Sequence, residues 1–201
     1  QGVQKRLGKR AAGIISRELK RPAQGEGRAE QRFLSAVTHK GMLTLWDTVT
    51  AQAERVYELA GEYGLAHHML APILTAALAA GHDAVACPDP MAPERLAHLI
   101  FPDLSLAFVT STQEVPWPHR AYRRLRLDAM ADQDAYRINR PRLRFAKRVA
   151  AALLDEGVAG LAQAKEAHDR LEKLYNPYVD FDGVARTADQ VADEVLALRD
   201  E

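Results

Sequence analysis

A segment with the sequence context of a phosphate-binding loop runs from Gly61 to His68. The apolar run Val56–Ala60 before it predicts a strand, and Pro72–Ala80 after it predicts a helix. Backbone N–H groups of such a loop, together with the N-terminus of the following helix, bind phosphate groups. The sequence therefore predicts a candidate nucleotide-binding loop, which consists of Gly61, Glu62, Tyr63, Gly64, Leu65, Ala66, His67 and His68.

The chemistry of this loop is incomplete. A working loop follows the pattern G-x-x-x-x-G-K-[ST], in which the lysine reaches the β- and γ-phosphates and the hydroxyl binds Mg²⁺. Ala66, His67 and His68 stand at the second glycine, the lysine and the hydroxyl. Imidazole titrates near pH 6.5, so unlike lysine it has no permanent positive charge. Mg²⁺ prefers oxygen ligands, which imidazole does not provide. We expect a degenerate loop with no catalytic residue and no required cofactor, and we keep binding of ATP with Mg²⁺ as an alternative.

Further candidate residues follow the next two predicted strands, Asp83–Cys87 and Leu104–Thr110. Ligands of α/β proteins bind beyond the carboxyl ends of the strands. The second of these strands ends in Thr110-Ser111-Thr112, which offers no carboxylate to orient Mg²⁺. The candidates for a pocket at these strand ends are Cys87, Asp89, Thr110 and Ser111.

A metal site is an alternative for the two histidines. Zn²⁺ accepts imidazole, thiolate and carboxylate ligands, which His67 and His68 could supply with Cys87, His82 or Asp89. Adjacent residues at the start of a helix diverge by about 100°, so two neighbouring histidines do not readily bind one ion. We therefore expect no metal site.

The remaining segments predict an α/β domain between two helical regions. Residues 3–20 have helical spacing, and Pro22 with Gln24–Gly27 predicts a linker after them. A short helix is expected at Pro93–Ile100. Because Pro72 belongs near the first turn of a helix, the helix after the loop is expected to begin later than in a working phosphate-binding loop.

Helical spacing continues after about residue 135. Gly157 and Gly160 suggest a turn between two helices, Asn176-Pro177 ends this section, and Ala185–Leu198 predicts a last amphipathic helix.

Several segments, in this order, resemble bacterial tandem P-loop ATPases of unassigned physiological role, in which two P-loop domains follow one another in one polypeptide. They are Arg32–Ala36 with His39–Gly41, the loop itself, Cys87–Pro90, Ile100–Thr112, Ala164–Tyr175 and Tyr178–Phe181. The resemblance implies a P-loop NTPase-like three-layer α/β domain with a mostly parallel sheet and a C-terminal helical appendage. It also implies nucleotide binding, and a partner that is another P-loop domain, either upstream in the same polypeptide or in a second copy.

The resemblance also implies a division of the chain into three parts. Residues 1–30 would be a basic helix and linker, the tail of a preceding domain. Residues 31–135 would form the P-loop-like α/β core, and residues 136–201 a helical appendage packed on that core. This chain would then be a non-catalytic domain that supports or pairs with an ATPase domain. The alternative is a nucleotide-binding enzyme that uses arginines from Arg120–Arg126, or from a partner chain, in place of the missing lysine.

The composition limits the binding partners and the cellular compartment that we expect for this protein. The chain has 201 residues, with 27 cationic and 27 acidic side chains, so no net field favours nucleic acid, and the basic stretches are interpreted as solvated faces. A single cysteine excludes an intrachain disulfide and favours a reducing compartment. No apolar run approaches the roughly 20 residues of a membrane span. We therefore expect a cytoplasmic protein that binds neither membrane nor nucleic acid.

Overall fold

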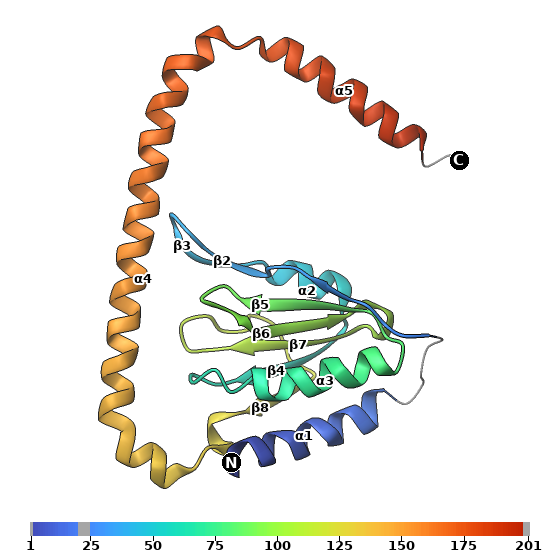
Figure 1. Cartoon of the computed structure of the whole chain (residues 1–201), viewed down its shortest axis with the longest axis vertical. Coiled ribbons are helices and arrows are strands. Elements are labelled where there is room, and N and C mark those ends of the chain that lie inside the picture. The colour runs from blue at the N-terminus through green and yellow to red at the C-terminus, as the bar shows by residue number, and fades with distance from the viewer. Residues whose placement is uncertain (1, 20–24, 199–201) are drawn as a thin grey trace.

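The computed structural model describes residues 2–19 and 25–198 and has an α/β core with a long helical arm beside it (Figure 1). Six strands form one sheet in the order β1-β5-β6-β7-β4-β8, in which β6 is antiparallel to both of its neighbours and the other pairs are parallel. The strands are β1 Ala29–Gln31, β4 Arg55–Ala60, β5 Ala84–Asp89, β6 Ala92–Phe101, β7 Leu106–Ser111 and β8 Arg123–Arg126. The predicted α/β class with a mostly parallel sheet is confirmed.

Both faces of the sheet are buried, and alternate residues of each strand face opposite sides. In β7, Leu106 and Phe108 pack in a cluster with α1 (Gly2–Glu18) and α3 (His67–Ala79). Ala107 and Val109 pack on the other side with α2 (Trp46–Gln52) and Trp117. A strand buried on both faces is largely apolar, which is why β4, β5 and β7 were predictable.

The segment expected as a short helix at Pro93–Ile100 belongs instead to strand β6, and that prediction is wrong. Leu99 and Phe101 face the cluster around α1 and α3, whereas Ile100 faces the cluster around α2. The buried part of this segment is only the short run His98, Leu99 and Ile100, and a run of this length has no period that distinguishes a strand from a helix. β6 returns from β5 through a tight turn, in which the Asp89 carboxylate accepts the Met91 N–H at 2.8 Å.

Helix α3 begins at His67, within the last two residues of the predicted loop, and not later as Pro72 suggested. Pro72 lies inside the helix on its exposed side. Met69, Leu70, Ile73 and Ala77 form a buried face against the sheet. Burial of this apolar face stabilises the helix enough to offset a proline that lacks one backbone hydrogen bond.

Helix α1 is part of the core, although the sequence suggested the tail of a preceding domain. Leu7, Ala11 and Ile14 are spaced along one face and are buried against α3. Near its end, Glu18 accepts hydrogen bonds from the Tyr57 hydroxyl and from Arg55, both at 2.5 Å. The predicted linker lies partly outside the described residues, since Pro22 and Gln24 are not among them.

Two smaller units complete the core. Strands β2 (Ser35–Thr38) and β3 (Gly41–Thr44) form an antiparallel hairpin before α2. Two 3-10 turns, Pro102–Leu104 and Asp128–Met130, precede β7 and follow β8. The second turn lies next to the loop after β4 and positions Asp128 there.

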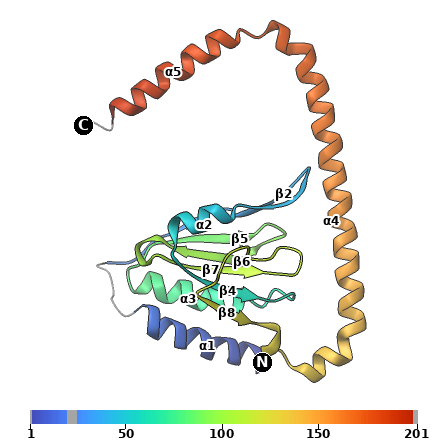
Figure 2. The same cartoon turned by 180° about the vertical axis from the view of Figure 1, so that it is seen from behind.

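The C-terminal region is a single long helix followed by a shorter one. Helix α4 runs from Gln133 to Tyr175 without the turn expected at Gly157 and Gly160. A 3-10 turn, Asn176–Tyr178, leads to α5 (Phe181–Ala197), whose start is capped by the Asp180 carboxylate. Figures 1 and 2 show α4 alongside the core and α5 extending from its far end. Among the described residues, neither helix has a buried side chain, and α4 contacts the core through side chains near its start, such as Tyr136 and Lys147.

Within the parts of the chain that the structure describes, no helix combines the length and the apolar character that a membrane crossing requires.

Candidate functional site

A pocket of about 680 Å³ lies at the carboxyl ends of the parallel strands β4, β7 and β8. Four predicted site residues line it: Gly61, Glu62, Tyr63 and Ser111. Arg124 and Arg126, from the stretch Arg120–Arg126 considered as a substitute for the missing lysine, also line it, and so does Asp128, which the sequence did not single out. The volume is in the range of small-molecule sites. The first half of the predicted loop therefore does border a pocket at the expected edge of the sheet.

The start of the loop is held against the end of β7 and the turn after β8. The Gly61 N–H donates to the Ser111 carbonyl at 3.0 Å, and the Glu62 N–H donates to Asp128 Oδ2 at 3.0 Å. A Cβ on Gly61 would lie 3.0 Å from Asp128 Oδ1 and 3.3 Å from the Leu127 Cβ. Glycine at position 61 thus permits the close approach of the Asp128 carboxylate to the loop backbone.

Asp128 places a carboxylate at the position where a phosphate-binding loop would bind a phosphate group of its ligand. Burial raises the pKa of Asp128 above its ordinary value, the Glu62 N–H opposes this rise, and the nearby Glu62 carboxylate adds to it. Asp128 Oδ1 is buried and has no hydrogen-bond partner among the described residues. The Asp128 carboxylate therefore accepts the hydrogen bond of a loop N–H group.

Glu58 forms a second carboxylate centre next to the pocket. It lies on β4, is 7% exposed, and accepts a hydrogen bond from Ser111 Oγ at 2.6 Å. Arg124 Nε lies 3.2 Å from its other carboxylate oxygen. Ser111 and Arg124 are therefore both engaged with Glu58. The sequence analysis missed this residue, although an acidic side chain inside the apolar run of β4 was a visible signal.

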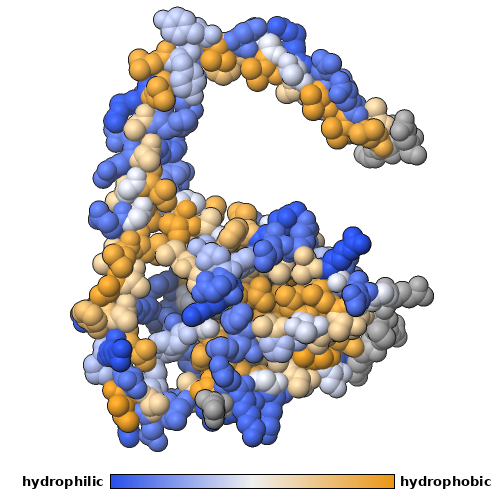
Figure 3. Space-filling model, in the orientation of Figure 1, coloured by the Kyte–Doolittle hydropathy of each residue, from blue (hydrophilic) through white to orange (hydrophobic). Residues whose placement is uncertain are grey.

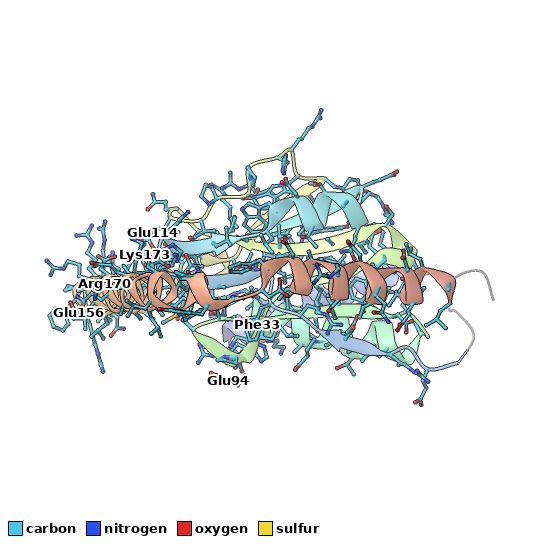
Figure 4. The ribbon with its side chains drawn as sticks, turned by 90° about the horizontal axis from the view of Figure 1, so that it is seen from above. Phe33, Glu94, Glu114, Glu156, Arg170 and Lys173 are labelled. Carbon is cyan, nitrogen blue, oxygen red and sulfur yellow. The ribbon has the colours of Figure 1, made fainter. Side chains whose placement is uncertain are left out.

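Glu62 connects the pocket to the helical arm. Its carboxylate accepts hydrogen bonds at 2.7 Å from the Gln113 N–H and from Lys147 Nζ on α4. Burial alone would raise the pKa of Glu62, but these two hydrogen bonds lower it below its ordinary value. Lys147 Nζ also lies 3.1 Å from Glu114, which Figure 4 shows beside α4. The ammonium group thus joins two carboxylates of the core and is not directed at a ligand.

Tyr63 makes the second contact between the loop and the arm. Its hydroxyl donates to the Tyr136 hydroxyl at 2.8 Å, and the two rings pack with their centroids 5.4 Å apart. The shared hydrogen bond raises the pKa of Tyr63 to about 12, so this phenol stays neutral near pH 7. The loop and the first turns of α4 therefore form one wall of the pocket.

The second half of the loop lies outside the pocket. Ala66 is buried in the cluster around α3, Leu65 packs against that cluster, and Gly64 adopts a left-handed φ of 63°. His67 Nδ1 accepts the Leu96 N–H of β6 at 3.0 Å, and burial lowers the pKa of His67. This imidazole is neutral near pH 7 and is held by the sheet. It cannot supply the permanent cation of a lysine.

The other predicted strand-end residues are dispersed. Cys87 is buried in the cluster around α2, where burial raises the pKa of its thiol to about 11. It lines a separate pocket of about 360 Å³ with Leu34 and Thr48. Asp89 accepts the turn N–H described above, and Thr110 Oγ1 donates to the Ala97 carbonyl at 2.5 Å. Of these four candidates, Ser111 alone lines the pocket at the ends of β4, β7 and β8.

The arrangement of histidines, cysteine and carboxylates does not form a metal centre. Within residues 2–19 and 25–198, no group of three or more such side chains is placed to hold a metal ion. His67 is engaged with β6, and its ring centroid lies 5.8 Å from that of His68. The zinc alternative therefore has no support in the described residues.

In comparisons with known proteins, this chain matched no family model, no curated protein and no solved structure.

Proposed function

We propose that this chain is a degenerate P-loop NTPase-like domain that does not hydrolyse nucleotide and that supports or pairs with an ATPase domain. The observation that carries the proposal is the hydrogen bond from the Glu62 N–H to Asp128. In a nucleotide-binding loop this backbone group would be available to a phosphate oxygen. Here a carboxylate of the same chain accepts it.

The charge around the loop also argues against a triphosphate. Two carboxylates, Glu62 and Asp128, and two guanidinium groups, Arg124 and Arg126, line the pocket. Arg124 is already paired with Glu58, so the cations do not outweigh the acids. A bound triphosphate would face Glu62 and Asp128 in a partly buried site, where repulsion between like charges is strong.

The strand, glycine loop and helix order supports the P-loop-like part of the proposal. The loop joins β4 to α3, and β4 is flanked by the parallel strands β7 and β8. Helices cover one face of the sheet through α1 and α3, and α2 covers the other. The antiparallel β6 departs from a wholly parallel sheet, but it lies two strands from β4 and does not alter the loop.

A titration with a fluorescent ATP analogue in the presence of Mg²⁺ tests this proposal. We expect no saturable binding at millimolar nucleotide and no release of phosphate. Micromolar binding that requires Mg²⁺ would contradict it. Asp128→Ala provides an informative comparison, because removal of this carboxylate frees the Glu62 N–H. If Asp128 is what excludes phosphate, the variant should bind the analogue more tightly than the unmodified chain.

A second candidate function follows from the position of the arginines. Arg124 and Arg126 border the same pocket as Gly61 and Glu62, as a substitute for the missing lysine would require. A nucleotide-binding enzyme of this kind predicts that Arg124→Ala with Arg126→Ala abolishes binding of the analogue. Arg120→Ala is the matched control, since Arg120 is exposed and does not line the pocket.

A further inference from the structure

The far half of helix α4 carries an exposed, largely apolar stripe. Leu161, Ala164, His168 and Leu171 follow one another at steps of three, four and three residues, which is the spacing of one helix face. All four side chains are exposed, Leu161 at 44% and Leu171 at 54%. Figure 1 shows this part of α4 beyond the tip of the β2–β3 hairpin, where the core no longer lies beside the helix. We call these four residues the α4 stripe.

Helix α5 carries a matching stripe of Phe181, Val184, Ala188 and Val191, again at steps of three, four and three residues. Its three large side chains are each more than half exposed. Val184, Ala188 and Val191 line an apolar groove along the helix. Figure 3 shows apolar atoms gathered along the length of α5. The order of steps is the same in both directions, so the two stripes match level by level when the helices are antiparallel.

Charged side chains of both helices lie on the sides away from these stripes. At about 100° per residue, Glu166 and Lys173 lie opposite the α4 stripe, and Arg186 and Asp193 lie opposite the α5 stripe. The one polar member, His168, has its Nε2 atom 3.1 Å from a carboxylate oxygen of Glu172, at the edge of the α4 stripe. A contact between the two stripes would therefore have an apolar centre, and His168 would keep a polar partner.

The chain between the helices is long enough to close this contact within one molecule. Only residues 176–180 connect α4 to α5, and helical hairpins use connections of two to five residues. With Leu171 level with Phe181, the end of α4 at Tyr175 would lie about 6 Å farther along the axis, and packed helices are about 10 Å apart. The six residue steps from Tyr175 to Phe181 extend to about 20 Å, which exceeds the resulting span of about 12 Å.

The short connection also favours α5 of the same chain over α5 of another copy. A short flexible link gives two tethered segments an effective concentration in the millimolar range. At micromolar protein, the same apolar contact therefore forms within one chain before it forms between two.

We propose that α5 folds back on the α4 stripe of its own chain and forms an antiparallel helical hairpin, with Leu161 level with Val191. The structure shows the open form, in which α5 diverges from the far end of α4 (Figure 2). Closure requires a change of backbone angles only in residues 176–180, of which 179 and 180 are not helical. This inference goes beyond the function proposed for the pocket and does not depend on it.

Hydrogen exchange of the α5 amides tests the closed form through changes made on α4. An isolated helix of 17 residues is marginally stable in water, so α5 amides that exchange slowly must be protected by packing. Leu161→Asp with Leu171→Asp should speed exchange in α5 by about tenfold or more, although the α5 sequence is unchanged. Arg170→Asp with Lys173→Asp, which places the same side chain away from the stripe, is the matched control and should leave α5 exchange as it is. Unchanged exchange in the stripe variant would overturn the proposal.

Disulfide formation tests which chain supplies α5. A single chain with Leu161→Cys and Val191→Cys, oxidised at low micromolar concentration, should form a disulfide within the molecule. Cys87 is buried and does not compete. The control pairs Leu161→Cys with Asp193→Cys, which is two residues from Val191 but on the far side of α5, and it should form much less. Equal yields from both pairs, or a disulfide that joins two chains, would overturn the proposal. The nucleotide titration concerns the pocket alone and is not affected by either result.

Discussion

Asp128 and Glu62 are two carboxylates close to one backbone loop, and they respond differently to that environment. Lys147 and the Gln113 N–H stabilise the charge on Glu62, whose pKa is lowered despite its burial. Asp128 is half-buried, its buried Oδ1 has no hydrogen-bond partner among the described residues, and its pKa is raised. A carboxyl group with a raised pKa destabilises the folded state once it is ionised. The ionised Asp128 carboxylate beside the loop therefore lowers the stability of the folded protein at neutral pH.

Asp128→Asn should remove this cost. The amide oxygen can still accept the Glu62 N–H, but it carries no charge. Between the ordinary carboxyl pKa and the raised folded value, the folded protein binds more protons than the unfolded chain, so its stability falls as pH rises. Relative to the unmodified chain, the variant should gain stability as pH rises through this window and then keep a constant advantage. Urea unfolding from pH 4 to pH 7 measures the difference.

A control separates this effect from the general loss of one negative charge. Asp155→Asn removes an exposed carboxylate on α4, away from the loop. If both variants change in the same way with pH, the environment of Asp128 is not the cause.

At the scale of the elements, helix α1 completes one face of the sheet. Leu7, Ala11 and Ile14 belong to the same buried cluster as Tyr57 and Phe108. The helix is amphipathic, and its cations lie on the solvent side, which is why its sequence alone suggested a separate basic segment. Periodicity identifies the face that is buried but not the element that covers it.

Ile14→Ala should therefore destabilise the whole core. Removal of a fully buried aliphatic side chain typically lowers the free energy of unfolding by about 2–5 kcal/mol. Arg10→Ala on the exposed side of the same helix should change it by no more than about 0.5 kcal/mol. Urea unfolding followed by tryptophan fluorescence reports on the core, because Trp46 and Trp117 both lie in it. Equal, small effects of the two changes would mean that α1 is an independent segment.

The sequence predicted the local features of the fold better than the contacts between segments that are distant in sequence. The run before Gly61 and the run ending in Ser111 were identified as strands, and both lead into the pocket. Asp128 was not identified, because it lies 66 residues from Glu62 and nothing near it in sequence indicates the contact. Gly157 was expected at a turn, but glycine lowers helix stability only by about 1 kcal/mol, which a long helix tolerates.

At the scale of the whole molecule, α4 is joined to the pocket near its start, through the Lys147–Glu62 salt bridge and the Tyr136–Tyr63 contact. The helix continues for 28 residues beyond Lys147 to Tyr175, which is about 42 Å. A tilt of α4 by about 10° at Lys147 would move its far end by about 7 Å. A small change of angle at the pocket would therefore displace the start of α5 by more than the roughly 5.4 Å pitch of a helix.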